Sequence, residues 1–505
     1  MNSTGTDMVT ATRIMIAIYM AATLIIVIRG AMKTKSMSDY AMGNFTFPPW
    51  AVGLSLSAAM TSAATFVINP GFIAYYGLSA VLSFAIVLPV ASMVSLVILT
   101  YSYRKHGSNV KAQTMAQWMG SRYGSDGYKL FFAFLSMLLV TFIVLICVGL
   151  TKVLARSLDI PELTVLTGIV VFIFGYMMFG GANSMVYTNT VQAILMLIVA
   201  VILLGSGYEH FSQGVKGFLD KLAAIDPKLV QSTNESSFLF RDYFEIIFTQ
   251  IIVGIAIVCQ PHIITKSMLI KSDSGVKKFL TVAVISQMIF FFVVFTGLYA
   301  RIMFPDLMFN GKPLSLDSVI PAYVVSEFPV YFGILVVLGL ISAGISTIEG
   351  LIQSISTTAT VDIIEPLFKK YLPEDEKKKS FVLMSLNKAV IAVFGAIAIY
   401  LSYEQLLNPK LSVGIFAQNG VYAYFSAAFL PILLGMFFKN VPKIAPIAAS
   451  VTAVIVHFTM YYGKLAVPYT KATGENPGVA ASMAILASMI VGFTVYYFTR
   501  EKDAE

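Results

Sequence analysis

Long apolar runs recur along the whole chain, and they limit what it can fold into. A membrane-spanning helix needs ~20 mostly apolar residues, and about thirteen runs reach that length. A soluble domain carries roughly 25% charged residues, whereas this chain has 12% charged and 57% hydrophobic residues. Lipid must therefore cover its surface, so the sequence predicts an all-α integral membrane protein of about 13 transmembrane helices. The runs lie near 12–29, 48–76, 79–102, 129–154, 162–180, 185–207, 242–264, 278–303, 325–362, 384–404, 411–437, 443–463 and 478–499.

Basic residues gather in alternate loops, after the first, third, seventh, ninth, eleventh and last of these runs. Cytoplasmic loops of membrane proteins carry such an excess, so the formal net charge of +8 needs no nucleic acid to explain it. With an odd number of spans, the pattern predicts a plasma (inner) membrane protein with its N-terminus outside and its C-terminus in the cytoplasm. Cys147 and Cys259 fall inside spans, where thiols pack as small apolar groups, so we expect no disulfide.

Helix breakers interrupt two of the spans. The second contains Gly53 and Asn69-Pro70-Gly71, and the seventh contains Gly254 and ends in Gln260-Pro261-His262. An unpaired backbone group in hydrocarbon costs several kcal/mol, so a broken helix persists only where protein buries it or where it borders a wet cavity. Freed carbonyls there can bind a cation. The alternative is that glycine and proline are simply common in membrane helices.

A single acid, Glu349, stands near the middle of the ninth run. A carboxylate at the bilayer centre costs at least ~2.5 kcal/mol, so it should face the bundle and have a partner. Ser342 and Ser346 precede it at helical spacing and share its face. Hydroxyl, carbonyl and carboxylate oxygens are ligands that hard cations prefer, although hydroxyls also help helices to pack closely. We expect no enzyme, because no Ser-His, paired-Asp or His-Glu-x-x-His arrangement accompanies the acid.

Several stretches, in order and on matching spans, resemble the sodium:solute symporter family. The resemblance covers about 40–440 and implies a leucine-transporter (LeuT) type fold, with a 5+5 inverted repeat and extra N- and C-terminal helices. The implied parts are an N-terminal helix and loop (1–40), a transport core (41–440, with repeats 41–207 and 241–440) and C-terminal helices with a short tail (441–505). The matching stretches are Ser55–Ala63, Gly180-Gly181 with Tyr187–Gln192, Gln260–Ile263, Ala343–Thr347 and Phe429–Phe437.

The resemblance also implies a main sodium site. In the family, two backbone carbonyls of the broken second span meet one carbonyl and two hydroxyls of the ninth. By position the ligands are Ala58, Thr61, Ala343, Ser346 and Thr347.

A second cation site departs from the family pattern. Many members place an aspartate where this chain has Asn189, and small hydroxyl residues where it has Glu349 and Gly350. The carboxylate has in effect moved from one helix to the other, and we expect Glu349 and Asn189 to form a local pair. Three roles stay open for the pair: a second cation site, a carboxyl that carries H+, or a structural hydrogen bond.

The predicted activity is sodium-coupled symport of a small organic solute. Sugar carriers of the family have polar residues where this chain has Phe84 and Val87, and proline carriers have aromatics at Val253 and Ile257. No Arg or Lys lies centrally in the relevant spans, so a short monocarboxylate or a small neutral amino acid is favoured over a multiply charged anion. The remaining polar candidates are Ser62, Thr65, Gln250, Gln260, Gln418 and Asn419.

Other functions are weaker. A proton-coupled or dual-cation symporter would use Glu349, whereas a membrane sensor without transport would need an output domain, and the chain shows none. A channel would line a whole path with polar groups, but these lie at one depth. The expected partners are therefore the solute, sodium and membrane lipid, with no obligate protein partner evident and no nucleic acid.

Overall fold

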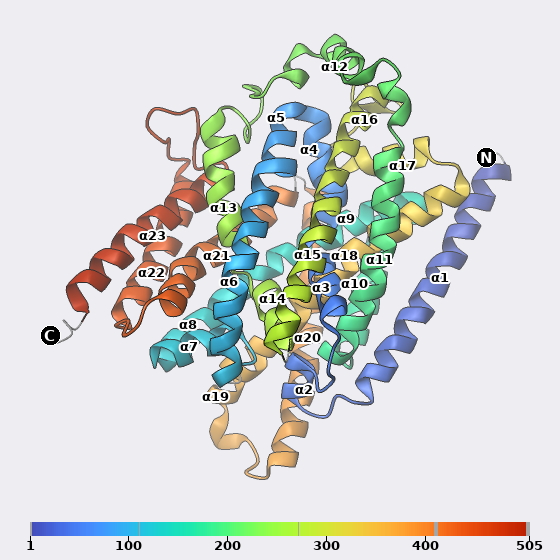
Figure 1. Cartoon of the computed structure of the whole chain (residues 1–505). Coiled ribbons are helices and arrows are strands. Elements are labelled where there is room, and N and C mark those ends of the chain that lie inside the picture. The colour runs from blue at the N-terminus through green and yellow to red at the C-terminus, as the bar shows by residue number, and fades with distance from the viewer. Residues whose placement is uncertain (1–2, 111, 271, 409–412, 501–505) are drawn as a thin grey trace.

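The computed structural model describes residues 3–110, 112–270, 272–408 and 413–500, and there the chain is almost entirely helical (Figure 1). Long helices run between an end of the molecule that carries α12 (Gly214–Ile225) and an end that carries α2 (Met37–Met42) and α19 (Glu365–Leu367). This is the arrangement that lipid imposes, because a helix satisfies all its backbone polar groups internally.

Six spans are single helices, and four more join helices through short π or 3₁₀ segments. The single ones are α1 (Ser3–Ala31), α11 (Ala182–Gly205), α20 (Glu376–Leu407), α21 (Val413–Phe437), α22 (Ile444–Gly463) and α23 (Pro477–Thr499). The joined ones are α5–η2–α6 (Leu78–Val81, Leu82–Val87, Leu88–Val110), α8–η3–α9 (Asp126–Leu135, Ser136–Leu139, Val140–Leu158), α15–η8–α16 (Asp273–Phe292, Val293–Phe295, Thr296–Met303) and α18–η10–α19 (Val330–Thr358, Ala359–Ile364, Glu365–Leu367).

Two further spans are bent. In the first, α3 (Pro49–Met60) meets η1–α4 (Ala64–Ile68, Asn69–Tyr76) at 55°, and in the second, η6–α13 (Phe244–Phe248, Thr249–Ile257) meets α14–η7 (Pro261–Ile264, Thr265–Leu269) at 56°. The shorter elements are α7 (Met115–Tyr123), α10 (Glu162–Met177), α17 (Val319–Glu327), the 3₁₀ turns η4 (Tyr208–Phe211), η5 (Pro227–Val230), η9 (Leu316–Ser318) and η11 (Lys369–Tyr371), and the hairpin β1–β2 (Met308–Phe309, Lys312–Pro313).

The predicted runs correspond one by one to these elements. Over the described residues, ten helices are long and apolar enough to cross a membrane, or twelve if each bent pair is one span. The one predicted run outside these twelve is the fifth, 162–180, which corresponds to α10 and has only 16 helical residues. The bent spans are second and seventh in this series, as expected. The inverted repeat stays a prediction.

The breaks do not all lie at the predicted residues. In the seventh run the prediction is right at Gln260-Pro261-His262, since Gln260 is extended (ψ 137°) and Pro261 restarts the helix, but wrong at Gly254, which is inside α13. In the second run the prediction is wrong, because Gly53 is inside α3 and Pro70 is in the first turn of α4. The chain breaks instead at 61–63, where Thr61 is extended (φ −110°, ψ 91°).

The predicted breaker glycines serve close packing. A Cβ on Gly53 would lie 2.6 Å from the Phe279 carbonyl oxygen, and one on Gly71 would lie 2.0 Å from that of Leu316. Each absent side chain therefore lets another helix or turn approach the backbone.

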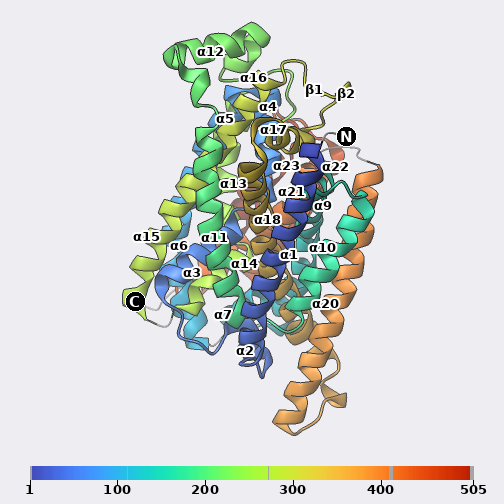
Figure 2. The ribbon, with the colours of Figure 1, turned by 90° about the vertical axis from the view of Figure 1, so that its right-hand side faces the viewer.

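Helix α18 lies at the centre of the bundle. It packs against α3, α9, α10 and α11, and 83% of its most apolar 18-residue window is buried, compared with 17% for α1. Helix α1 runs along the outside (Figures 1 and 2). The polar groups of α18 are therefore held away from lipid. Most of the predicted ion-binding residues belong to this helix.

A glycine substitution tests this packing. Gly297 of α16 lies against α4, and a Cβ there would be 2.1 Å from the Pro70 carbonyl oxygen. We expect Gly297→Ala to lower stability by about 1–3 kcal/mol, the usual cost of overpacking. Gly168 of α10 is the matched control, since a Cβ there meets nothing within 4 Å. Thermal unfolding of the purified protein in detergent measures both, and equal melting temperatures would contradict the packing.

Candidate functional site

The centre of the molecule holds a junction between the broken end of α3 and the middle of α18. The Ser346 hydroxyl donates to the Ala58 carbonyl at 2.9 Å. The Thr347 hydroxyl donates to the Ala59 carbonyl at 3.1 Å and approaches that of Ala58 at 3.4 Å. Both hydroxyls also reach the Ala343 carbonyl, at 3.1 and 3.3 Å. The structure thus brings together four of the five residues predicted for the main sodium site.

The fifth, Thr61, is the C-cap of α3, and its N–H bonds back to the carbonyls of Ser57 and Ala58. Its hydroxyl donates to the Gln287 side-chain oxygen of α15 at 3.2 Å. The prediction assigns its backbone carbonyl, and not this hydroxyl, to the cation. Neutral carbonyl and hydroxyl oxygens are the donors that a hard monovalent cation accepts, so the residues fit sodium.

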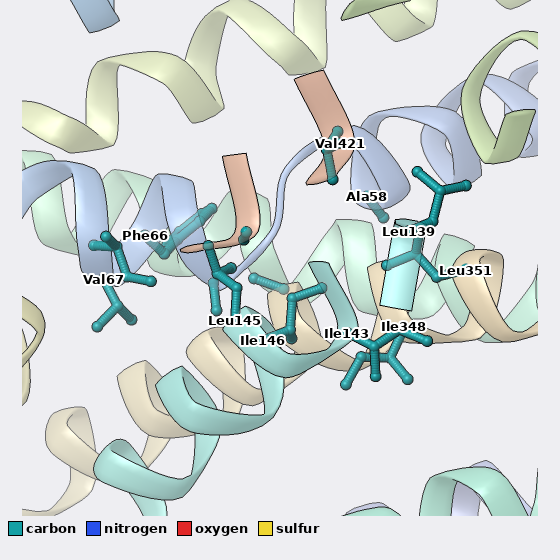
Figure 3. Close-up of a cluster of buried hydrophobic side chains, with 14 of the residues drawn as sticks. Ala58, Phe66, Val67, Leu139, Ile143, Leu145, Ile146, Ile348, Leu351 and Val421 are labelled. Atoms are coloured by element: carbon teal, nitrogen blue, oxygen red, sulfur yellow. The ribbon is translucent and has the colours of Figure 1, made fainter. Parts of the chain in front are cut away.

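An apolar layer surrounds this junction. Figure 3 shows Ala58 on one half of the broken span and Phe66 and Val67 on the other, joined by extended chain. Ile143 of α9 and Ile348 of α18 belong to the same buried cluster and have 0% exposure. Because these neighbours offer no polar atoms, the freed carbonyls depend on the hydroxyls of α18 or on a cation.

Glu349 begins a second polar cluster. Its carboxylate is fully buried, and it accepts hydrogen bonds from the Tyr176 hydroxyl of α10 and, at 2.7 Å, from the Thr188 hydroxyl of α11. Two helices therefore hold its oxygens in place. Sequence reasoning assigned no role to either residue: Tyr176 lies in an apolar run, and Thr188 lies in the stretch Tyr187–Gln192 that carries part of the resemblance.

Asn189 connects this carboxylate to the ammonium group of Lys266. When its amide is oriented to satisfy both neighbours, the nitrogen donates to Glu349 Oε2 at 2.8 Å and to Gln192 Oε1 at 3.0 Å, and the oxygen accepts from Lys266 Nζ at 3.0 Å. The opposite orientation gives only a long 3.4 Å bond to the Ser346 carbonyl, so we assign the first. The expected proximity of Glu349 and Asn189 agrees with this geometry.

The position of Lys266 corrects the sequence analysis. It was counted among the basic residues of a loop, and the relevant spans were expected to lack a central Lys or Arg. Lys266 is instead in η7, 3% exposed, and its ammonium donates to both the carbonyl and the hydroxyl of Ser55 at 2.9 Å. The sequence carried a signal: Pro261 restarts the helix, so the next residues continue the span.

Ser342 also departs from expectation. It lies on the predicted face of α18, but its hydroxyl is directed at the Tyr19 hydroxyl of α1 at 3.3 Å. Gln192 reaches the same phenol at 3.2 Å. The peripheral helix α1 is thereby connected to the polar cluster, whereas Ser346 alone of the two serines faces α3.

A cavity of about 100 Å³ lies beside the junction. Six of the ten candidate substrate residues line it: Ser62, Thr65, Phe84, Ile257, Gln260 and Gln418. Its described lining also includes His262, Phe142, Phe291 and Tyr422, and contains no Asp, Glu, Lys or Arg. The expected lack of Lys and Arg in the spans themselves is wrong, because they include the buried Lys266, but neither residue type is in the described lining of this cavity.

The other four candidates lie elsewhere. Val87, Gln250 and Val253 are outside the described lining, and Val253 is buried among other apolar side chains. The Asn419 side chain faces α22, where it bonds the Tyr462 hydroxyl at 3.3 Å and the His457 ring at 3.1 Å. The helix register inferred from sequence was wrong at this point, because adjacent residues on a helix point about 100° apart.

A second cavity, of about 30 Å³, lies towards the α2 end and is lined by Met42, Gln113, Lys266, Gln353 and Ser354 among others. Over the described residues the two linings share only His262. Both nitrogens of this buried ring lack a protein hydrogen-bond partner, as does Oε1 of Gln260. Buried polar atoms are normally paired, so these atoms are available to a bound molecule.

The family follows from comparison with known proteins. The model of the sodium:solute symporter family matches residues 40–452. The chain belongs to this family. It is therefore a secondary transporter and not an enzyme, and its long apolar helices make it an integral membrane protein.

Similar transporters share most of its length. The chain is 25% identical over 467 residues to the sodium/pantothenate symporter of Escherichia coli (strain K12), covering 90% of each. It is 22% identical to the sodium/sialic acid symporter SiaT of Proteus mirabilis (strain HI4320), covering 88% of each. It is 23% identical to the sodium/glucose cotransporter of Vibrio parahaemolyticus, covering 86% of the chain and 81% of that protein.

A solved structure supports the fold. The substrate-bound outward-open state of a Na+-coupled sialic acid symporter matches all of both chains with a TM-score of 0.76 at 18% identity. That likeness confirms the predicted all-helical transporter fold.

Charge pairing in the polar cluster can be measured in this transporter. Glu349→Gln leaves the buried Lys266 ammonium without a counter-charge, and we expect a loss of about 3–5 kcal/mol. The double variant Glu349→Gln/Lys266→Met removes both charges and should recover most of that loss. Thermal unfolding in detergent gives the comparison. Strictly additive effects of the two substitutions would show that the charges do not interact.

Proposed function

We propose that this transporter couples the movement of sodium to uptake of a small organic solute by alternating access. Sodium is held by Ala58, Thr61, Ala343, Ser346 and Thr347. The observation that carries the proposal is the contact of the Ser346 and Thr347 hydroxyls with carbonyls freed at the end of α3. Similar proteins described as sodium symporters for three different solutes support it.

Sodium bound at this junction would hold α3 and α18 together. Five oxygens from α3 and α18 hold the ion only when the two helices are adjacent, so binding stabilises the conformation in which they meet. Moving one charge across 100 mV is worth ~2.3 kcal/mol. A negative interior and a low internal sodium concentration therefore favour release inside the cell. The N-terminus outside and the C-terminus in the cytoplasm complete the proposed orientation.

We infer that the solute is a short monocarboxylate or a small neutral amino acid. The cavity beside the junction is small, and its described lining is uncharged and largely apolar. A single carboxylate can accept hydrogen bonds from the Ser62 and Thr65 hydroxyls, and the unpaired Gln260 oxygen can accept from an amino or hydroxyl group. These groups stand at the two helix breaks, beside the proposed ion.

His262 forms the barrier between this solute cavity and the second cavity in the proposed cycle. Its ring packs against Phe142, with the centroids 6.3 Å apart. His262 lines both cavities. In the proposed cycle, movement of the His262 side chain connects them. The second cavity then serves as the exit path towards the α2 end.

Removing the two hydroxyls tests the ion site. Ser346→Ala with Thr347→Ala deletes two of the five proposed oxygens. We expect the sodium concentration for half-maximal uptake to rise tenfold or more, about 1.4 kcal/mol. Sodium titration of solute uptake in proteoliposomes measures it. Ser342→Ala is the matched control, because its hydroxyl faces Tyr19 of α1. A sodium curve unchanged in the double variant rules out this site.

Two adjacent residues test the solute cavity. Gln418 lines it, whereas Asn419 bonds His457 and Tyr462 on the other side of α21. Gln418→Ala should raise the KM for the solute several-fold, and Asn419→Ala should leave the KM within twofold. A thermal-shift screen of small acids and amino acids, with and without sodium, first identifies the solute, since ligands stabilise the folded form. Equal effects of both variants on the KM would contradict the assignment.

A further inference from the structure

The buried ammonium of Lys266 is placed as a bound cation would be. It has three N–H donors, and three oxygens accept from it: the carbonyl and hydroxyl of Ser55, each at 2.9 Å, and the amide oxygen of Asn189 at 3.0 Å. All three are neutral oxygens of the type that hard cations prefer. Lys266 is 3% exposed, and these three contacts are all with protein oxygens.

The counter-charge is one hydrogen bond further away. Glu349 receives the Asn189 amide at 2.8 Å, the Thr188 hydroxyl at 2.7 Å and the Tyr176 hydroxyl. The Asn189 amide lies between the two charges, with its nitrogen donating to the carboxylate and its oxygen accepting from the ammonium. The cluster as a whole carries one positive and one negative charge, and so it is neutral without any bound ion.

We propose that Lys266 is a tethered cation that takes the place of a second sodium ion, so that this transporter binds one sodium per chain. The inference rests on the proposed sodium site at Ser346 and Thr347. The ammonium contacts oxygens of Ser55 and Asn189, and the Asn189 amide in turn donates to Glu349. None of these three residues is a proposed ligand of the main sodium site. Ser55 lies one turn before Ala58 on α3, so the ammonium and the sodium ion hold the same helix at successive turns.

This assignment decides among the roles left open for Glu349. A second mobile cation would have to displace an ammonium whose three donors are satisfied. Glu349 then serves as the fixed counter-charge of Lys266. The tether also connects the two bent spans, since Lys266 belongs to the second and Ser55 to the first.

Equilibrium binding of ²²Na⁺ to the purified full-length protein in detergent tests the proposal without knowledge of the solute. We expect one sodium per wild-type chain. Lys266→Ala leaves the Ser55 and Asn189 oxygens and an uncompensated Glu349 carboxylate, and we expect it to bind two, a twofold increase. Adding Glu349→Gln to Lys266→Ala should return the number to one, because the charge that attracts the second ion is gone.

The outcomes separate this inference from the proposed function. Two sodium ions on the wild type, or still one on folded Lys266→Ala, overturn the tethered cation and leave sodium coupling intact. Absence of sodium binding to the wild type overturns the proposed function and the inference with it. If Lys266→Ala does not fold, Lys266→Met/Glu349→Gln replaces it: one ion supports the proposal, and two overturn it.

Discussion

The contact between the broken end of α3 and the hydroxyls of α18 is the interaction on which the rest of the structure depends. A helix that stops at Met60, in the middle of an apolar bundle, leaves its last carbonyls short of regular intrahelical partners, and that of Ala58 receives only a 3.3 Å bond from the Thr61 N–H. Lipid and apolar side chains cannot satisfy them. Ser346 and Thr347 do so, and α18 is accordingly one of the two most enclosed spans among the described residues, the other being α21. The carbonyls that need a hydroxyl donor can also bind a cation. The atoms that hold α3 against α18 are therefore the same atoms that are proposed to bind sodium.

Much of the architecture could be predicted from the sequence, because hydrocarbon restricts the choices. Thirteen apolar runs became helices or bent pairs, and Pro261 marked one of the breaks correctly. The break at 61–63 could not be predicted from local sequence. Thr61, Ser62 and Ala63 have no strong helix-breaking tendency. The helix ends there beside distant partners: hydroxyls of α18 donate to the carbonyls of Ala58 and Ala59, and Gln287 of α15 accepts from the Thr61 hydroxyl. Gly53 and Gly71 were the more conspicuous signals, and they mark close helix contacts instead.

Side-chain direction was the weaker part of the prediction. The residues of the proposed ion site followed from the resemblance, and four of the five lie together. The substrate residues required the rotation of each helix about its axis, and a single sequence does not fix this for a helix that is apolar all round. Asn419 shows the consequence: one residue after Gln418, it turns away from the cavity to pair with His457. Lys266 shows a different failure, because hydropathy assigns a lysine at the end of an apolar run to a loop. Its burial depends on Glu349, Asn189 and Ser55, which come from three other helices.

Lys266 and the proposed sodium ion differ in one physical respect that bears on transport. Both are monovalent cations held by neutral oxygens of α3, at Ser55 and near Ala58. Sodium leaves when the helices separate, and its binding free energy is therefore available to drive the cycle. A lysine moves with its own helix, so its attraction to Ser55 and Glu349 is the same at every sodium concentration. Replacing a bound ion by a tethered ammonium thus keeps the electrostatic support of the bent spans and removes one ion from the coupling. The driving force per cycle is then that of a single sodium ion, which limits how steep a solute gradient the transporter can sustain.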